Sequence, residues 1–371
     1  MSPIAQSAPF HHVNAQTPTA QHRALRIWLF AIAALIFAMV IVGGATRLTD
    51  SGLSITEWQP ILGVIPPLNE ADWQAALEKY RQIPQYQLIN KGMSLAEFKA
   101  IYWWEWAHRF LGRFIGVAFF VPFMIFLASG AIPRPLLPKL VGIFLLGGAQ
   151  GALGWYMVMS GLTERTDVSQ YRLAAHLGLA VLIYAAVLWV AFGLGRRADG
   201  NSDRQAPSSL KVAVAGLAVL IFLQILLGGF VAGTNAGLSH NTWPLMDGAL
   251  IPKGLGAMEP WYLNAFENVL TIQFNHRMLA YAIAVLAAIN VALALRSGAP
   301  AAGSAAIAVF AIVLVQIVLG ILALLSHLQI GLALAHQAGG IVLLGVVLHQ
   351  LHGLTAGQVA HDDLQRAPAG A

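Results

Sequence analysis

Four histidines occupy matching positions in the two halves of this chain. His108 and His176 lie in the first half. His276 and His336 lie in the second half, again at the start of apolar runs. Two imidazoles that face each other across a helical bundle can bind the iron of one planar macrocycle, so this duplicate pattern predicts two bis-histidine heme sites. The alternative is that membrane histidines only bond neighbouring helices.

The composition places these histidines in a membrane protein. Of the 371 residues, 58% are hydrophobic and only 10% are charged, which is more apolar than a soluble core can bury. Eight apolar runs are long enough to cross the roughly 30 Å of bilayer hydrocarbon. They cover residues 27–46, 107–128, 137–159, 172–195, 211–232, 275–296, 305–325 and 330–353. The predicted fold class is therefore an all-α integral membrane protein with eight transmembrane helices.

Basic residues predict the orientation of these helices. Arginines and lysines gather in short connections on one side, at Arg134, Lys139, Arg196, Arg197 and Arg296. The positive-inside rule places that side in the cytoplasm. We therefore expect an inner-membrane protein with both termini in the cytoplasm and the four histidines toward the periplasm.

Composition also excludes several classes of function. The net charge of +5 is not gathered into a basic stripe with interleaved aromatic residues, which argues against a nucleic-acid partner. The chain has no cysteine, so thiolate-bound heme, iron–sulfur clusters and disulfides are excluded. Histidine is the remaining soft ligand for iron.

The second half repeats the first. The segment 43–54 with its Gly-Gly pair reappears at 228–239, shifted by 185 positions. Later pairs keep their order with smaller shifts: His108 with His276 (168), Gln150 and Gly154 with Gln316 and Gly320 (166), and His176 with His336 (160). Because each copy has four helices, both enter the membrane in the same direction. The repeat predicts two tandem, pseudo-symmetric four-helix bundles.

The expected domains follow from the repeat and the apolar runs. We expect an N-terminal tail at 1–26, a first bundle at 27–195 with a long outer loop at 47–106, and a cytoplasmic linker at 196–210. The second bundle is expected at 211–353 and a C-terminal tail at 354–371.

The two copies differ beside the first histidine of each half. The first reads Trp-Glu-Trp-Ala-His-Arg at 104–109, and the second reads Ile-Gln-Phe-Asn-His-Arg at 272–277, so Gln273 stands where the first half has Glu105. Glu105 precedes His108 by three positions and shares its helix face. We expect a partly buried carboxyl group among Trp103, Trp104 and Trp106, placed for proton transfer. An ion pair of Glu105 with Arg109 or Arg113 is the alternative.

At these motifs the chain resembles the heme A synthase family of the proteobacterial and mitochondrial type. The resemblance rests on Gly-Gly-Ala-Thr-Arg-Leu-Thr-Asp-Ser-Gly-Leu-Ser at 43–54, Glu-Phe-Lys-Ala-Ile-Tyr-Trp-Trp-Glu-Trp-Ala-His-Arg at 97–109 and Gln-Phe-Asn-His-Arg at 273–277. It spans nearly the whole chain after the N-terminal tail. Another branch of the family carries a cysteine pair in the outer loop, which is absent here.

The resemblance implies an oxidoreductase that converts heme O to heme A. The methyl group at porphyrin C8 would be oxidised to a formyl group by successive hydroxylations, and the product would serve terminal oxidases. A heme b cofactor would be held by His276 and His336. The substrate heme would lie between His108 and His176, with Glu105 in the reaction.

Other residues receive weaker roles. Arginines at helix ends are candidates for heme propionate contacts, although such arginines also serve as interface anchors; they are Arg47, Arg109, Arg113 and Arg277. The outer loop, with a polar helical stretch near 70–82, could cap the substrate site or form a docking surface. The histidines without duplicate support are interpreted as structural or interfacial, or as part of a tail: His240, His327, His349 and His352, and His11, His12 and His22.

Two rival functions share some of these features. A diheme cytochrome b that takes electrons from quinol would use the same four histidines but needs no carboxylate in one half only. A transporter with parallel repeats would bind no heme. Pathway logic adds heme O synthase as a candidate partner, and the residues leave the electron donor, the source of the formyl oxygen and homo-oligomerisation open.

Overall fold

The computed structural model describes residues 20–59, 62–163, 165–195 and 206–366, with side chains described as far as Thr355. These residues form helices α1 to α10 and short 3-10 turns. The helices are α1 Ala20–Leu48, α2 Glu70–Tyr80, α3 Pro84–Leu88, α4 Leu95–Ala128, α5 Leu137–Thr163, α6 Gln170–Gly193, α7 Ser208–Gly233, α8 Val269–Arg296, α9 Pro300–Leu325 and α10 Ile330–Arg366. Within the described residues, eight helices are long and apolar enough to cross a membrane. The predicted all-α fold class is confirmed.

The three largest differences from the predicted helix boundaries are at α1, α10 and α4. α1 begins at Ala20 and not at 27, and α10 continues to Arg366, past 353, so the expected tails are partly helical. The remaining tail residues, His11 and His12 among them, and most of the expected linker lie outside the described residues.

The third difference is at α4, which begins at Leu95 and not near 107. Its start is fixed by a capping box: the Ser94 hydroxyl accepts from the Glu97 backbone N–H, and the Glu97 carboxylate accepts from the Ser94 N–H at 2.8 Å. A count of apolar residues misses these polar first turns, which carry α4 beyond the membrane span.

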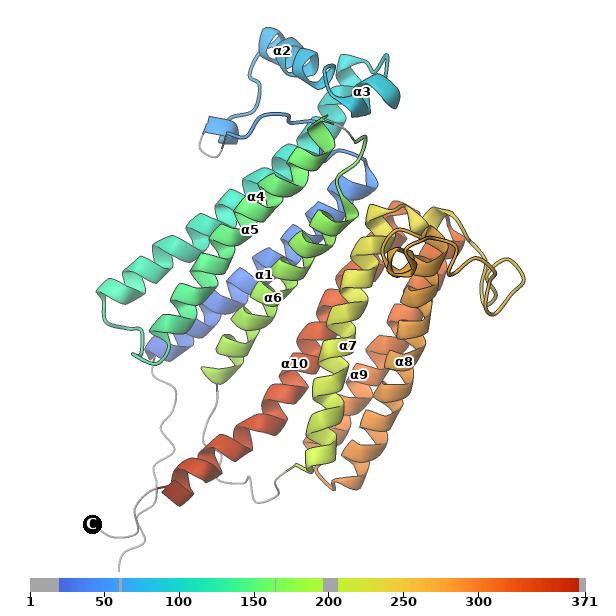
Figure 1. Ribbon diagram of the computed structural model, residues 1–371. Helices are drawn as coiled ribbons and strands as arrows, with labels where there is room; N and C mark the ends of the chain where they lie inside the picture. Colours follow the sequence, from blue (N-terminus) through green and yellow to red (C-terminus); the bar gives the residue numbers. More distant parts are fainter. Residues whose placement is uncertain (1–19, 60–61, 164, 196–205, 367–371) are drawn as a thin grey trace, which may run out of the picture.

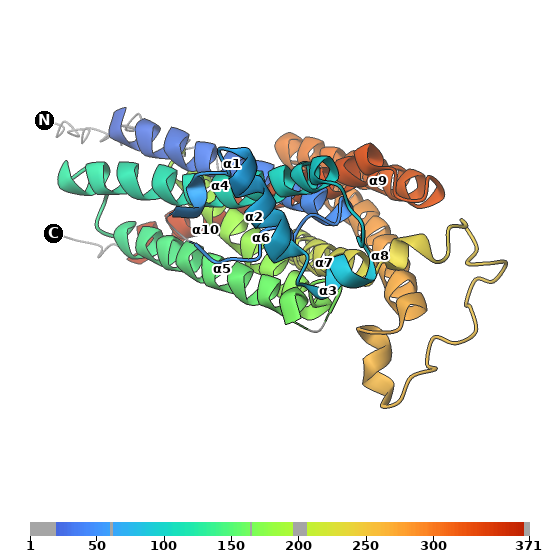
Figure 2. The same cartoon turned by 90° about the horizontal axis from the view of Figure 1, so that it is seen from above.

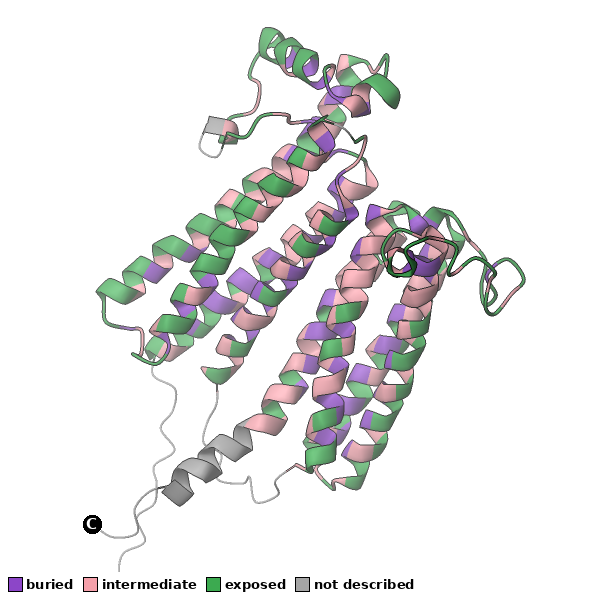
Figure 3. Cartoon of the chain, viewed as in Figure 1, coloured by how far each residue is buried: buried purple, intermediate pink, exposed green. Residues whose placement is uncertain are grey.

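The membrane helices gather into two groups of four, α1 with α4, α5 and α6, and α7 with α8, α9 and α10 (Figure 1). The groups meet through α1, α6, α7 and α10, where the apolar core is continuous. Polar contact also crosses the junction, because the Gln337 amide on α10 donates to the Val40 carbonyl of α1 at 2.7 Å. Buried residues are most frequent on α1 and α6, two of these central helices, and Figure 3 marks them in purple.

The outer loop of the first half folds over one end of its helices. Viewed from above, α2 and α3 lie across the ends of α4, α5 and α6 (Figure 2). They share a small apolar core with the first turns of α4, made of Leu53, Trp73, Leu77, Tyr80, Ile83, Phe98, Tyr102 and Val168. The helical stretch expected near 70–82 is confirmed as α2, with Asn69 accepting from the Asp72 N–H as its N-cap.

Candidate functional site

The four predicted histidines lie at one end of the two helix groups, on the side of α2 and α3. His108 is on α4 and His176 on α6, while His276 is on α8 and His336 on α10. Within the described residues, each ring keeps a buried Nδ1 atom without a hydrogen-bond partner. Buried imidazole nitrogens without partners are unfavourable unless a ligand satisfies them.

The pair in the second half has a geometry that suits one iron atom. The ring centroids of His276 and His336 are 6.3 Å apart and their planes meet at 78°. Imidazoles bound at about 2 Å on opposite faces of one metal have centroids about 6 Å apart. The described residues contain no cluster of three or more His, Cys, Asp or Glu that could hold a bare ion. The arrangement of His276 and His336 fits two imidazoles that bind one metal, with a macrocycle supplying the other ligands of that metal.

Each histidine ring packs against a glycine of a neighbouring helix. A Cβ added at Gly43, Gly154 or Gly320 would lie 2.9 Å from the Cε1 atom of His108, His176 or His336 respectively. At Gly228 the same atom would be 3.5 Å from His276 Cε1, an ordinary contact. The repeat exposed these glycines by position, but only the structure shows that they make room for the rings.

Glutamine side chains orient two of the rings. The Gln150 amide donates to the His176 carbonyl at 3.0 Å and lies 3.4 Å from His176 Nε2. Gln224 makes the same pair of contacts to His276, at 3.0 and 3.2 Å. Sequence reasoning missed Gln224 because its counterpart at the 185-residue shift is Met39, so the repeat does not mark it.

Glu105 is buried at 2% exposure and accepts every hydrogen bond described for it. The Ser54 hydroxyl and the Ile55 backbone N–H each donate to Oε2 at 2.7 Å. Arg109 donates to Oε1 through Nε at 3.0 Å and through its terminal nitrogen at 2.6 Å. The ion pair with Arg109 that the sequence left open is therefore present.

The expected aromatic surroundings of Glu105 are largely wrong. Trp103 and Trp104 are 44% and 43% exposed, so they point away from the carboxylate. Successive residues of a helix lie about 100° apart, so direct neighbours in sequence cannot enclose one side chain. The loop at Ser54 and Ile55 provides the cover.

Arg109 and Arg277 hold matching points of the two outer loops. Arg109 donates to the carbonyls of Ile55 at 2.6 Å and Glu57 at 2.8 Å. Arg277 donates to the carbonyl of His240 at 2.9 Å and to Gln273 Oε1 at 3.1 Å. The Nε and one terminal nitrogen of Arg277 are buried without a partner among the described residues. A guanidinium in this state suits an anionic group such as a propionate.

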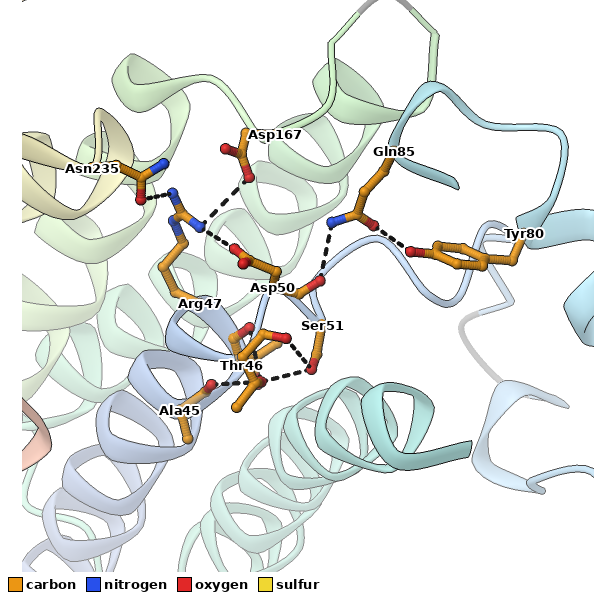
Figure 4. A network of polar contacts seen from close by, with 10 residues as sticks. Ala45, Thr46, Arg47, Asp50, Ser51, Tyr80, Gln85, Asp167 and Asn235 are labelled. Atoms are coloured by element: carbon orange, nitrogen blue, oxygen red, sulfur yellow. Dashed lines mark hydrogen bonds and ion pairs between the residues drawn. The ribbon is translucent and has the colours of Figure 1, made fainter. Parts of the chain in front are cut away.

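Arg47 and Arg113 are engaged elsewhere. Arg113 donates to the Gln59 carbonyl at 2.9 Å, so it anchors the outer loop. Arg47 joins the two halves: it donates to Asp50 at 2.8 Å and to Asn235 at 2.9 Å, with Asp167 at 3.5 Å (Figure 4). Asp50 and Asn235 are equivalent in the repeat, and both adopt the left-handed backbone conformation, with φ of 49° and 54°.

The histidines without an equivalent in the repeat contact other groups through their rings. His240 is 3.5 Å from the Asp247 carboxylate in the second outer loop. His349 and His352 pack edge-on against Phe192 and Trp189 at the opposite end of the helices. These contacts agree with a structural role.

Comparison with known proteins places the chain in a family. Residues 26–348 match the family model described as cytochrome oxidase assembly protein. The heme A synthase of Parvibaculum lavamentivorans is 55% identical over 344 residues, which cover 92% of this chain and 98% of that protein. The heme A synthases of Bradyrhizobium diazoefficiens and Nitrosospira multiformis are each 52% identical, over 95% and 90% of this chain and 97% and 94% of those proteins. The chain thus belongs to the cytochrome oxidase assembly family, and these heme A synthases are its relatives.

Proposed function

We propose that this protein is a heme A synthase, a multi-pass membrane oxidoreductase that converts heme O to heme A. The C8 methyl group of the substrate is oxidised to a formyl group by successive hydroxylations. The identity of about half of all residues to heme A synthases, over nearly the full length, supports this reaction. The eight apolar helices and the paired histidines agree with a lipid-soluble heme substrate.

The first half is the proposed site of reaction, with the substrate heme between His108 and His176. The observation that carries this assignment is Glu105, a buried carboxylate for which the second half has Gln273. Glu105 exchanges protons as the methyl group is oxidised, because it can hold a proton and an amide cannot. Ser54, Ile55 and Arg109 return the carboxylate to one position after each exchange.

The second half is the proposed site of a heme b cofactor, which supplies single-electron transfer when bound. His276 and His336 would be its axial ligands, and the 6.3 Å between their rings supports this. Gln224 fixes the His276 ring. The unpartnered donors of Arg277 would bind a propionate, which would neutralise the buried cation.

The orientation in the membrane is also a proposal. Arg134 lies between α4 and α5 and Lys139 lies in the first turn of α5, at the end opposite the histidines. They support a cytoplasmic location for that end and a periplasmic one for both sites. We place the protein in the inner membrane with both termini cytoplasmic. Heme O synthase is the proposed source of the substrate.

Glu105→Gln tests the reaction and its location together. The variant gives the first half the residue of the second, so the loop contacts have a precedent in Gln273. Coexpressed with heme O synthase, native protein should accumulate heme A, and the variant should form at least about 100-fold less while keeping heme b. Mass analysis of extracted hemes measures both. If both proteins hold only unmodified heme, the electron-transferring cytochrome is the correct function.

A further inference from the structure

Helix α5 lacks the buried stripe of its repeat counterpart α9. On α9 the buried residues recur every three or four positions and form one face: Gly303, Ala306, Val309, Val313 and Gln316. On α5 no residue is buried between Ile143 and Gly161, and all six residues at 144–149 are exposed. Six successive helical residues point in every direction around the axis, so the inner side of this stretch is uncovered.

The repeat identifies which positions of α5 face inward. The shift that pairs Gln150 with Gln316 also pairs Gly147 with Val313 and Gly151 with Ile317. Val313 is 2% exposed, and Ile317 packs against the apolar core. A Cβ at Gly147 or Gly151 would meet no atom within 4 Å. The first half is therefore open where the second half is filled by side chains.

The open side of α5 reaches the lipid. α8 and α9 pack along each other, whereas α4 and α5 touch at few points. Gly116 on α4 also has no neighbour within 4 Å of an added Cβ, and Phe120 and Met124 beyond it are exposed. Figure 3 marks many residues of both helices as exposed, in green. Phe120 stacks on Phe144 of α5 with ring centroids 5.4 Å apart, one turn before Gly147. Apolar side chains thus line the opening that we infer between α4 and α5 beyond this contact.

The same opening is continuous with the first histidine site. Gln150 lies on the turn between Gly147 and Gly151 and donates to the His176 carbonyl. One turn further along α5, Gly154 packs against the His176 ring. Gln150 Oε1 and His176 Nδ1 are both buried, and neither has a partner among the described residues. Unsatisfied polar atoms at the inner end of an apolar opening indicate a ligand that is polar at one end and apolar at the other.

We propose that the isoprenoid chain of heme O lies along the inner face of α5 and enters from the lipid between α4 and α5. This inference rests on the proposed function, which places the substrate heme at His108 and His176. Heme O has a long apolar chain where heme b has a small vinyl group. The open first half accepts the chain, and Val313 and Ile317 exclude it from the second half. The presence of these side chains in one half and their absence in the other thus determines which heme each half binds.

A double variant fills the opening with the residues of the second half. Gly147→Val with Gly151→Ile introduces the side chains found at Val313 and Ile317. Ala149→Val with Ala152→Val is the matched control, because it copies Val315 and Val318, which are 56% and 54% exposed on the lipid side of α9. Valine and isoleucine are better helix formers than glycine, so the filling pair does not break α5. In the control pair, valine in place of alanine lowers helix propensity only slightly.

Both variants are purified after coexpression with heme O synthase, and their hemes are extracted and identified by mass. The filled variant should hold at least about tenfold less heme O plus heme A per chain, with heme b at the native level, and the control should match native protein. Native heme O binding in the filled variant, or equal loss in the control, would overturn the proposal. If the filled variant loses heme b as well, Gly147→Ala replaces it and must weaken heme O more than heme b.

A separate variant keeps the two hypotheses apart. His176→Ala should abolish heme O binding if the first half holds the substrate. Native heme O binding in that variant refutes the proposed site itself. Loss in His176→Ala together with native binding in the filled variant refutes only the route along α5.

Discussion

Equivalent arginines bind the outer loops of the two halves, but one hydrogen-bond partner of each arginine differs. Arg109 donates to the Ile55 carbonyl and to the carboxylate of Glu105. Arg277 donates to the equivalent carbonyl, at His240, and to the amide oxygen of Gln273. An amide beside the arginine is therefore sufficient to keep this contact between arginine and outer loop. The carboxylate in the first half adds an ion pair with Arg109, and we propose that it also transfers protons, which an amide cannot do.

The change of partner also alters the charge balance of each half. Glu105 neutralises Arg109 within the protein. Gln273 leaves the guanidinium of Arg277 without a described anionic partner, with two donor nitrogens unpaired. The charge of Arg109 is thus balanced within the protein. The charge of Arg277 would be balanced by a bound anion.

The largest expected effect separates the two arginines. Arg109→Ala leaves Glu105 buried without its cation, a change that typically costs about 3–5 kcal/mol. Arg277→Ala leaves only a neutral amide and should cost about 1 kcal/mol. Thermal unfolding of both variants in one detergent measures the difference. Adding Glu105→Gln to Arg109→Ala should recover much of the loss, and an equal melting temperature for the two single variants would remove the charge argument.

A smaller effect is expected at the glycines behind the first histidines. Gly43→Ala puts a methyl group 2.9 Å from the His108 ring, while Gly228→Ala puts one at 3.5 Å from His276. Crowding of this kind costs about 1–3 kcal/mol, so Gly43→Ala should reduce heme O content about tenfold. Heme b in Gly228→Ala should stay near the native level. The heme content of purified protein gives the answer, and the reverse order would contradict the packing shown here.

Gln224 offers a milder test of the second site. Gln224→Met introduces the residue of the first half, Met39, and removes the amide beside His276. Loss of one such hydrogen bond should lower heme b affinity about fivefold and shift the reduction potential of that heme. A redox titration followed by absorption measures the shift. Gln150→Met, which acts on His176, is the control and should leave the heme b potential unchanged.

The smallest effect is expected where Arg47 joins the two halves. Arg47→Ala removes partly exposed contacts to Asp50, Asp167 and Asn235, which together should contribute about 1 kcal/mol. The melting temperature should fall by a few degrees with both hemes retained. Asn235→Ala, which removes only the contact to the second half, should lower it less. Loss of heme in Arg47→Ala would instead indicate a direct contact with a propionate.

Much of this organisation could be predicted from the sequence. The membrane helices appear as apolar runs because lipid requires about 20 successive apolar residues. The histidines and the exchange of Glu105 for Gln273 appear because the two copies can be aligned. The Glu105 and Arg109 pair was one of two alternatives, since residues four apart on a helix are neighbours.

The remaining features depend on contacts between distant segments. Ser54 and Ile55 reach Glu105 from a different part of the chain, so no local pattern marks them. The early start of α4 is set by polar capping that hydropathy does not detect. Arg47 resembles a membrane-interface arginine by sequence, yet its partner Asn235 lies in the other half.

We propose that the two similar halves hold different hemes and that only the first half transforms its heme. The most direct measurement is the identity and amount of heme in His176→Ala and in His336→Ala, each coexpressed with heme O synthase. His176→Ala should keep heme b and contain neither heme O nor heme A. His336→Ala should lose heme b and keep heme O. Loss of the same heme from both variants, or the reverse pattern, would contradict the assignment of the two halves.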